Sequence, residues 1–323
     1  MKKSVNRCTF TQKLNVMFFT CLIAFISLTA NSQQAVWLDA DTGNEVDDVY
    51  AILRLLEDKS VSVAGISSAH FNNPDLLVFE KWNQYPTSGI SSLDISQQLN
   101  EDILKKLGRT DVGCYIGADR QIGRAWGGYE PRDSEAARQL AAYVKSMPEG
   151  RKLDVISLGA LTNVASAIIL YPEIIPRIRC YILGARYEAS TGVWDKNEFN
   201  IRNDLNAFDY LLNNKEVDLT IMPITTVLSY RFRKDDTFAR LQKDNPAHKL
   251  LIDRWEETEP GSRVRVLWDL GLVEAYLKPE YVKIEHRPAP PENGSREVKV
   301  YTSVETNKIF DDFWIFMERL KKI

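Results

Sequence analysis

The chain has 323 residues, of which 44% are hydrophobic and 26% are charged, and its formal net charge is −3. These values are typical of a globular protein with enough apolar residues for a large core. The near-neutral charge gives no reason to expect nucleic acid or an acidic membrane surface as a partner. We therefore expect neither.

The N-terminal segment has the pattern of a secretory signal peptide. Four basic residues, the last of them Lys13, precede an apolar run from Val16 to Ala30, and small residues follow as far as Ser32. The run is shorter than the roughly 20 apolar residues of a membrane span. We expect residues 1–32 to be cleaved and residues 33–323 to be secreted or periplasmic. An uncleaved membrane anchor is the alternative.

Just after the apolar run 35–38, ten residues carry five acidic side chains, namely Asp39, Asp41, Glu45, Asp47 and Asp48. A strand, a turn and a helix are predicted here, because a glycine and then a helical apolar pattern follow. The acids then lie at the carboxyl edge of a strand, where α/β proteins bind ligands. So many carboxylates need a cation, and oxygen ligands favour calcium or magnesium. Alternatively, these acids only cap the helix or face solvent.

Short apolar runs alternate with helical patterns along the rest of the chain. The expected strands are 61–67, 113–117, 153–158, 179–183 and 217–222, and the expected helices are 134–146, 162–170 and 204–214. Such alternation indicates βαβ units. We therefore predict one α/β domain over residues 33–323, with a mostly parallel, Rossmann-like sheet and helices on both faces.

The C-terminal region is predicted to add a surface loop at 288–294, a strand at 297–304 and an amphipathic helix at 310–320. The helix carries aromatic residues and a methionine at helical spacing. We expect this stripe to lie in the core.

Only two cysteines, Cys114 and Cys180, lie outside the predicted signal peptide. Both occur in apolar, strand-like segments, so we expect buried free thiols. A disulfide between them stays open, because the sequence does not reveal the distance between their backbones. The chain has only three histidines, which makes a zinc site a poor expectation.

The acidic segment resembles the signature Asp-x-Asp-Pro-Gly-x-Asp-Asp of the nucleoside hydrolase family, of the inosine/uridine-preferring type. Here Thr42 replaces the proline, and two extra residues follow Gly43. Three further segments are similar to motifs of that family in the same order, so the resemblance covers nearly the whole mature chain. These segments are 157–163, 197–201 with the downstream Asp204, and 267–269.

The resemblance implies a nucleoside hydrolase-like fold and an exported, calcium-dependent hydrolase. Such an enzyme cleaves the N-glycosidic bond of a ribonucleoside or related N-riboside, releasing ribose and a free base in nucleoside catabolism. The resemblance assigns the metal to the carboxylates of Asp41, Asp48 and Asp269 and the main-chain carbonyl of Thr162. Because calcium would bind both hydroxyls of a ribose, 2′-deoxynucleosides should be poor substrates. A homo-oligomer is a further implication.

Among the remaining residues, Asp41 resembles the general base of the family and Asp47 the partner of a ribose hydroxyl. Glu198 and Asn200 resemble sugar-binding residues, although they could also form a local helix cap. Asp39 and Asn72 are expected to support the site from behind its direct ligands.

Trp268 stands where many family members carry a histidine that protonates the leaving base. Its indole donates a hydrogen bond but cannot deliver a proton near neutral pH. It could stack on a base or pack as part of the wall. A riboside-binding protein with weak or lost turnover is therefore the alternative function. A phosphatase of the haloacid dehalogenase type is disfavoured, because Gly43 occupies the position where that family has Thr or Val.

Overall fold

The computed structural model describes residues 33–71, 90–294 and 296–320. Residues Ala35–Ile323 form one compact unit, and Met1–Gln34 form a separate one. Apart from Gln34, the first residue of β1, all the elements described below belong to the larger unit. The predicted signal peptide, residues 1–32, and Asn72 lie outside the described residues.

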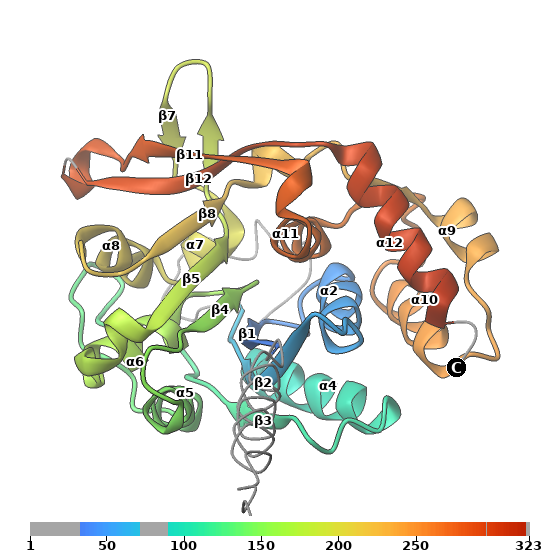
Figure 1. Cartoon of the computed structure of the whole chain (residues 1–323), viewed down its shortest axis with the longest axis horizontal. Helices are drawn as coiled ribbons and strands as arrows, with labels where there is room; N and C mark the ends of the chain where they lie inside the picture. The colour runs from blue at the N-terminus through green and yellow to red at the C-terminus, as the bar shows by residue number, and fades with distance from the viewer. Residues whose placement is uncertain (1–32, 72–89, 295, 321–323) are drawn as a thin grey trace, which may run out of the picture. The chain divides into compact units, whose positions relative to one another are not determined.

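An eight-stranded sheet forms the centre of the fold, in the order β11-β12-β8-β5-β4-β1-β2-β3 (Figure 1). The pairs β1–β4, β4–β5, β5–β8, β8–β12 and β2–β3 are parallel, and the edge strand β11 runs antiparallel to β12. The mostly parallel sheet predicted from the sequence is confirmed. The strands are β1 (Gln34–Ala40), β2 (Val61–Ser68), β3 (Gly113–Ile116), β4 (Leu153–Ser157), β5 (Ile178–Leu183), β8 (Leu219–Met222), β11 (Val282–Pro288) and β12 (Glu297–Val304).

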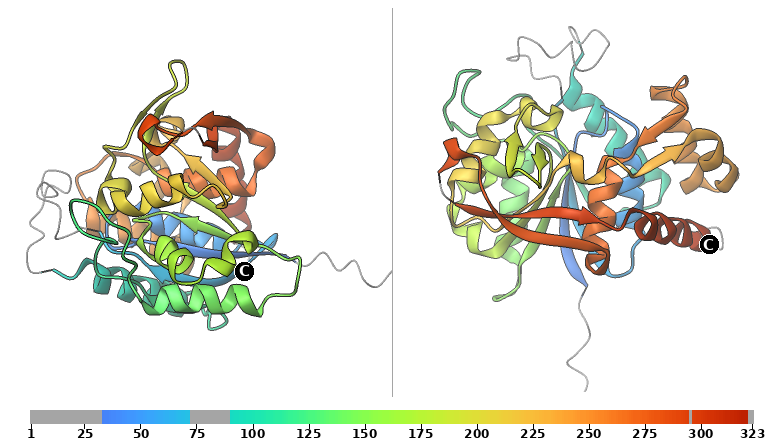
Figure 2. Two further views of the ribbon diagram at one scale, coloured as in Figure 1. Left: turned by 90° about the vertical axis from the view of Figure 1, so that its left-hand side faces the viewer. Right: turned by 90° about the horizontal axis from the view of Figure 1, so that it is seen from above.

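Helices cover both faces of the sheet and create two apolar cores (Figures 1 and 2). Side chains alternate along β1, so Leu38 packs into one core and Trp37 into the other. The Leu38 core receives α2 (Asp47–Leu56), α4 (Ser92–Lys106), α10 (Pro246–Thr258), α11 (Trp268–Leu277) and α12 (Thr306–Leu320). The Trp37 core receives α5 (Glu135–Ser146), α6 (Thr162–Leu170) and α8 (Leu205–Asn213).

The aromatic stripe of the last helix lies in the core, as predicted. Phe313, Trp314 and Met317 of α12 are buried, and Phe310 packs against the same cluster. Cys114 and Cys180 are free thiols, and burial raises the pKa of each to about 12. Within the described ranges, no helix combines the length and apolar character needed to cross a membrane.

The remaining elements are short and lie outside the central sheet. Two small antiparallel pairs are β6 (Arg186–Glu188) with β7 (Val193–Asp195), and β9 (Arg231–Arg233) with β10 (Val264–Val266). The other elements are α7 (Phe199–Asn203), α9 (Lys234–Arg240) and the 3₁₀ helices η1 (Pro172–Arg177), η2 (Ile224–Val227), η3 (Pro279–Tyr281) and η4 (Pro291–Asn293).

Three neighbouring parallel strands end at the same level of the sheet. Asp39 of β1 is paired with Ser157 of β4, and Ser157 is paired with Ile182 of β5. The loops that leave β1, β4 and β5 therefore start side by side at one sheet edge. This edge is where α/β proteins bind ligands.

Candidate functional site

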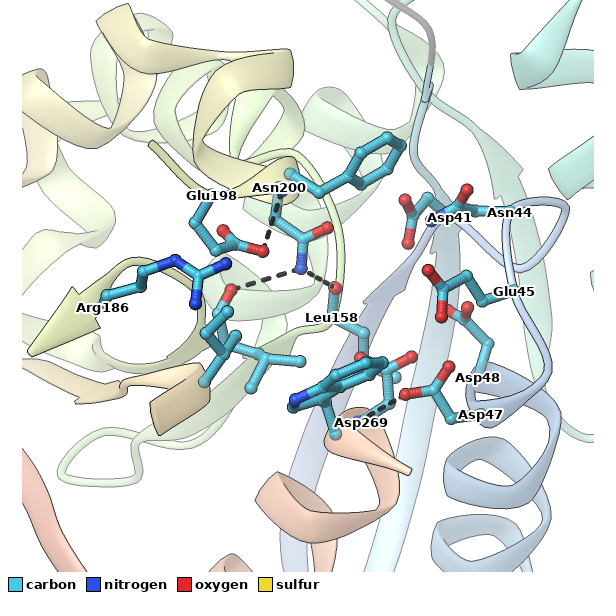
Figure 3. Close-up of a pocket in the computed structure, with 14 residues that line it drawn as sticks. Asp41, Asn44, Glu45, Asp47, Asp48, Leu158, Arg186, Glu198, Asn200 and Asp269 are labelled. Carbon is cyan, nitrogen blue, oxygen red and sulfur yellow. Dashed lines mark hydrogen bonds between the residues drawn. The ribbon is translucent and has the colours of Figure 1, made fainter. Parts of the chain in front are cut away.

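A pocket of about 230 Å³ opens at the carboxyl edge of β1, β4 and β5 (Figure 3). The loop after β1 and the start of α2 form one wall, and β5, β6 and α7 contribute to the opposite wall. The lining residues are Asp41, Asn44, Glu45, Asp47, Asp48, Leu158, Leu183, Arg186, Glu198, Phe199, Asn200, Ile224, Trp268 and Asp269.

Buried carboxylates from two distant segments converge in this pocket. Asp47, Asp48 and Asp269 each place one carboxylate oxygen within 4.8 Å of the others. Asp47 and Asp48 belong to the first turn of α2, and Asp269 belongs to the first turn of α11. Asp41 lines the same pocket from the loop after β1. The sequence prediction that these four acids share a site agrees with their positions.

The acid cluster is not neutralised by the protein alone. Burial, followed by the charges of Asp48 and Asp47, raises the pKa of Asp41 well above its usual value. Burial and neighbouring carboxylates likewise raise the pKa of Asp48 and Asp269. Two buried oxygens, Oδ2 of Asp41 and Oδ1 of Asp48, have no hydrogen-bond partner among the described residues. Unpartnered carboxylate oxygens in a buried cluster fit a hard divalent cation.

The turn that carries these acids is anchored by two helices. Arg254 of α10 donates to the main-chain carbonyls of Thr42 at 2.9 Å and Glu45 at 3.0 Å. The Thr42 hydroxyl donates to Asn100 of α4 at 2.6 Å. Gly159, after β4, leaves room for Asp41, since an added Cβ would lie 2.8 Å from the Asp41 carboxylate carbon. The positions of the carboxylates are thus set by packing on both sides.

Asp39 lies behind the pocket. Its carboxylate accepts hydrogen bonds from Ser67, from Ser157 at 3.2 Å and from Asn163 at 2.9 Å. Burial raises the Asp39 pKa to about 6, although these three donors oppose the rise. Asp39 therefore ties β1 to β2, β4 and the start of α6.

The structure does not bring Thr162 to the pocket, which corrects its expected position. Thr162 is the first residue of α6, its hydroxyl donates to Asp204, and His70 Nε2 lies 2.9 Å from the same hydroxyl. The main-chain carbonyl of a residue in a helix is directed along the helix toward its own hydrogen bond. Leu158, which directly follows β4, lines the pocket from the same segment. Of the segment 157–163 that the motif indicated, Leu158 and not Thr162 is among the residues that line the pocket.

Glu198 and Asn200 form part of the opposite wall. The Glu198 carboxylate accepts from the main-chain N–H groups of Asn200, Ile201 and Ala185, each at 3.2 Å. The Asn200 amide donates to the main-chain carbonyl of Leu158 at 2.5 Å. Glu198 is therefore both a pocket residue and a helix cap, although the helix that it caps is α7, which was not predicted, and not the helix that follows Asp204.

Trp268 lies beside Asp269 at the start of α11 and lines the pocket. Its indole Nε1 is buried and has no hydrogen-bond partner in the described part of the chain. The Arg265 guanidinium carbon lies 5.9 Å from the centre of the Trp268 ring. Buried His70 does not line the pocket, and burial lowers its pKa to about 4.

Some pocket residues were not predicted from the sequence. Glu45 belongs to the acidic segment, but the sequence analysis gave it no role. It forms an ion pair with Arg265. Burial, followed by the charge of Asp47, raises the Glu45 pKa to about 7. Arg186 follows β5 at the same edge as the acids, and that position was the signal available. The others are Asn44, Leu158, Leu183, Phe199 and Ile224.

The family model of the inosine-uridine preferring nucleoside hydrolases matches residues 86–312. The chain belongs to this family and is a hydrolase that acts on N-glycosyl bonds. The matched region contains Glu198, Asn200 and Asp269. Asp41 and Asp48 precede the matched region in the sequence, but the folded chain brings them into the same pocket. No curated protein sequence matches the chain significantly.

Solved nucleoside hydrolases share the fold. The plant nucleoside hydrolase PpNRh1 is 17% identical with a TM-score of 0.64, covering 89% of this chain and 98% of its own. The purine-preferring ribonucleoside hydrolase from Gardnerella vaginalis is 19% identical with a TM-score of 0.63, covering 90% and 99%. The inosine-uridine preferring nucleoside hydrolase from Bacillus anthracis is 15% identical with a TM-score of 0.62, covering 90% and 99%. The predicted family and fold class are confirmed.

Proposed function

We propose that the protein hydrolyses the N-glycosidic bond of a ribonucleoside or related N-riboside with the help of calcium. The observation that carries this proposal is the convergence of Asp41, Asp48 and Asp269 in one pocket, with two buried oxygens lacking partners. A cluster of carboxylates can bind a cation, and it can also stabilise the positive charge that develops on the sugar during cleavage.

The carboxylates of Asp41, Asp48 and Asp269 would hold the cation, and Leu158, which lines the same pocket, would add its main-chain carbonyl. Calcium takes about six to eight oxygen ligands in flexible geometry, whereas magnesium usually keeps several waters. An all-oxygen protein cage therefore favours calcium. When bound, the ion would supply positive charge to offset the cluster and would offer a binding point for the vicinal hydroxyls of the ribose.

Asp41 is the best-placed general base. Asp41 lines the pocket, and its buried Oδ2 has no partner among the described residues, so it would be available to accept the proton of the attacking water. Asp47 is placed to accept a hydrogen bond from a ribose hydroxyl. The surrounding carboxylates stabilise the oxocarbenium-like transition state. Asn200 and Glu198 position the sugar from the opposite wall.

The leaving base receives no proton from Trp268, because an indole N–H is not an acid near neutral pH. Other side chains of neighbouring loops that carry an N–H or O–H, namely Tyr187, Tyr230, Arg231 and Arg233, are not among the residues that line the pocket. Bases that leave readily should therefore be released fastest.

We also propose that the enzyme is exported. The basic and apolar pattern of residues 1–32 supports this proposal. N-terminal sequencing of protein from the culture medium or periplasmic fraction tests it, and the expected mature chain begins near Gln33. A protein retained in the cytoplasm with residue 1 still present would contradict export.

A ribose-release assay tests the enzymatic proposal. Purified mature protein is given a panel of ribosides and their 2′-deoxy analogues, with calcium or with a chelator. Ribose release should require calcium and should be much weaker for the deoxy compounds. Calcium binding without release from any riboside would favour the binding-protein alternative.

Two variants make this assay specific. Asp41→Asn should lower kcat by roughly 10²- to 10⁴-fold, the usual range for loss of a general base. Asp48→Asn should abolish the thermal stabilisation by calcium together with activity. Asp253→Asn is the matched control, since Asp253 pairs with Lys249 on the outside of α10, away from the pocket. Unchanged calcium affinity in Asp48→Asn would contradict the ligand assignment.

A further inference from the structure

Arg186 is the only basic side chain among the described residues that line the pocket. It is the first residue of β6 and lies on the wall opposite Asp41, Asp47 and Asp48 (Figure 3). The family motifs found in the sequence assign it no role. A cation in a pocket otherwise built from acids and apolar groups needs an explanation.

The backbone that carries Arg186 is held firmly and is strained. Ala185 has φ of 60°, the only positive φ of a non-glycine residue in the described ranges. Main-chain hydrogen bonds fix both of its polar groups: its N–H donates to Glu198 at 3.2 Å, and its carbonyl accepts from Ile224 at 3.0 Å. A left-handed alanine is unfavourable, and such strain persists where it positions a functional group. Here it directs the chain so that Arg186 enters the pocket.

The Arg186 guanidinium is not used by the fold. It makes no hydrogen bond within the described residues, and its one ion-pair partner is Asp195 on the facing strand β7. The Nε to carboxylate distance is 4.0 Å, and both side chains are about half exposed, at 43% and 54%. Exposed pairs of this geometry contribute little. Its guanidinium N–H donors can therefore serve a ligand.

Glu198 is an acidic neighbour that opposes anion binding here. Burial raises the Glu198 pKa, and its three main-chain donors and then the nearby charge of Arg186 oppose that rise. The Glu198 carboxylate, however, already accepts three main-chain N–H groups, from Ala185, Asn200 and Ile201. These donors offset much of its charge, so the pair with Asp195 is the one ion pair that Arg186 makes among the described residues. A guanidinium with free N–H groups binds phosphate or carboxylate oxygens in a bidentate manner.

We propose that Arg186 binds an anionic group of the substrate, and that this group is a phosphate on the 5′ arm of the ribose. The inference rests on the proposed function. If the 2′ and 3′ hydroxyls of a ribose face the acidic wall, its base and its 5′ arm are the substituents that remain. The family resemblance puts Trp268 beside the base, so we assign the 5′ arm to the opposite wall, where Arg186 lies. The substrate class is then a ribonucleoside 5′-phosphate or a related 5′-phosphorylated N-riboside rather than a neutral nucleoside.

The test compares adenosine 5′-monophosphate with adenosine, with calcium present, for the unaltered enzyme and the Arg186→Gln variant. The ratio of the two kcat/KM values should favour the phosphate in the unaltered enzyme. It should fall by about 10- to 100-fold in the variant, as expected for loss of charged hydrogen bonds. Arg186→Lys should lose part of this preference, because lysine keeps the charge without the fork. The control is Arg138→Gln, because Arg138 is an exposed residue of α5 that pairs with Asp133. This variant should keep the ratio of the two kcat/KM values unchanged.

Two further measurements separate this inference from the proposed function. Calorimetric titration with ribose 5-phosphate and with ribose measures binding without turnover, and only the phosphate should bind more weakly to Arg186→Gln. Equal ratios in the unaltered enzyme and the variant, while adenosine is still hydrolysed, would overturn the role of Arg186 and leave the hydrolase intact. Orotidine carries a carboxylate on its base and has no 5′-phosphate. If Arg186 raised kcat/KM for orotidine but not for ribonucleoside 5′-phosphates, the assignment of Arg186 to the 5′ arm would be overturned. If no riboside is hydrolysed, the proposed function fails, and the ribose 5-phosphate titration still decides the anion site.

Discussion

The Asp47 carboxylate accepts a hydrogen bond from the main-chain N–H of Asp269 at 3.1 Å, although the two residues are 222 positions apart. Main-chain N–H groups at a helix start have no partner within the helix. Asp47, from the first turn of α2, therefore caps α11 and holds Asp269 in the acid cluster. One residue thus contributes to the pocket wall and to its assembly.

This cap can be tested by comparing Asp47→Asn with Asp47→Ala. Both variants remove a charge from the cluster, but only asparagine keeps an oxygen that accepts from Asp269. We expect the alanine variant to be less stable than the asparagine variant by about 1 kcal/mol, as for loss of other helix caps. Urea unfolding in the presence of a chelator measures the difference. Equal free energies of unfolding would show that the bond to α11 contributes nothing.

Gly159 gives a steric test of the Asp41 position. In Gly159→Ala the new Cβ would lie 2.8 Å from Cβ, Cγ and Oδ1 of Asp41, so the carboxylate must move. We expect calcium binding and ribose release to fall together, by roughly 10-fold or more, while the circular dichroism spectrum is retained. Gly261→Ala is the matched control, because no atom lies within 4 Å of its added Cβ. Full activity in Gly159→Ala would show that Asp41 need not be held in place.

Stability of the metal-free protein should depend on pH in a direction set by the acid cluster. Burial and mutual repulsion raise the folded-state pKa values of Asp41, Asp48 and Asp269 above the ordinary value of 3.8. The folded state then binds more protons than the unfolded state. This contribution to stability is fully present below about pH 4 and is lost as pH rises through the folded-state pKa values.

Calcium should reverse that loss, because it takes the place of the protons. The increase in melting temperature on adding calcium should therefore be larger at about pH 8 than at about pH 5. Asp39 and Asp204, whose pKa values burial raises to about 6, titrate with the same sign but do not line the pocket. Comparing scans with and without calcium removes their contribution. An equal shift at both pH values would count against the acid cluster as the calcium site.

Trp268→His should supply the acid that the pocket lacks. We expect kcat to rise for ribosides whose base is a poor leaving group. For 4-nitrophenyl riboside, whose leaving group needs no proton, kcat should be nearly unchanged. A panel of purine and pyrimidine ribosides assayed beside 4-nitrophenyl riboside gives the comparison. No change across the panel would mean that position 268 does not face the leaving base.

Local sequence patterns were enough to predict β1, the acidic turn that follows it and α2. A strand, a turn with glycine and an amphipathic helix can each be recognised from a few neighbouring residues. Asp269 entered only through the family resemblance, since no local pattern reveals a contact 222 positions away. Thr162 was also assigned from the family motif, and the helix start at Thr162 was predicted correctly; what the motif did not reveal is that Leu158 is the residue of this segment that lines the pocket.

The hairpin of β6 and β7 had no usable sequence signal, and the only pointer to Arg186 was its position shortly after the predicted strand 179–183. Each strand has only three residues, and Glu188, Val193 and Asp195 are exposed, so neither strand shows a clear apolar alternation. Their position follows from contacts made elsewhere, such as the Tyr187 N–H to Thr225. Tertiary structure, rather than local preference, determines this wall of the pocket.

The acidic turn and α11 meet only after nearly the entire polypeptide has been made. A product that ends before Asp269 retains the complete acidic segment yet lacks the cap donor and one carboxylate of the cluster. Nascent or partly degraded chains should consequently be inert toward ribosides. Calcium retention could then serve as a simple assay of whether a preparation has folded to completion.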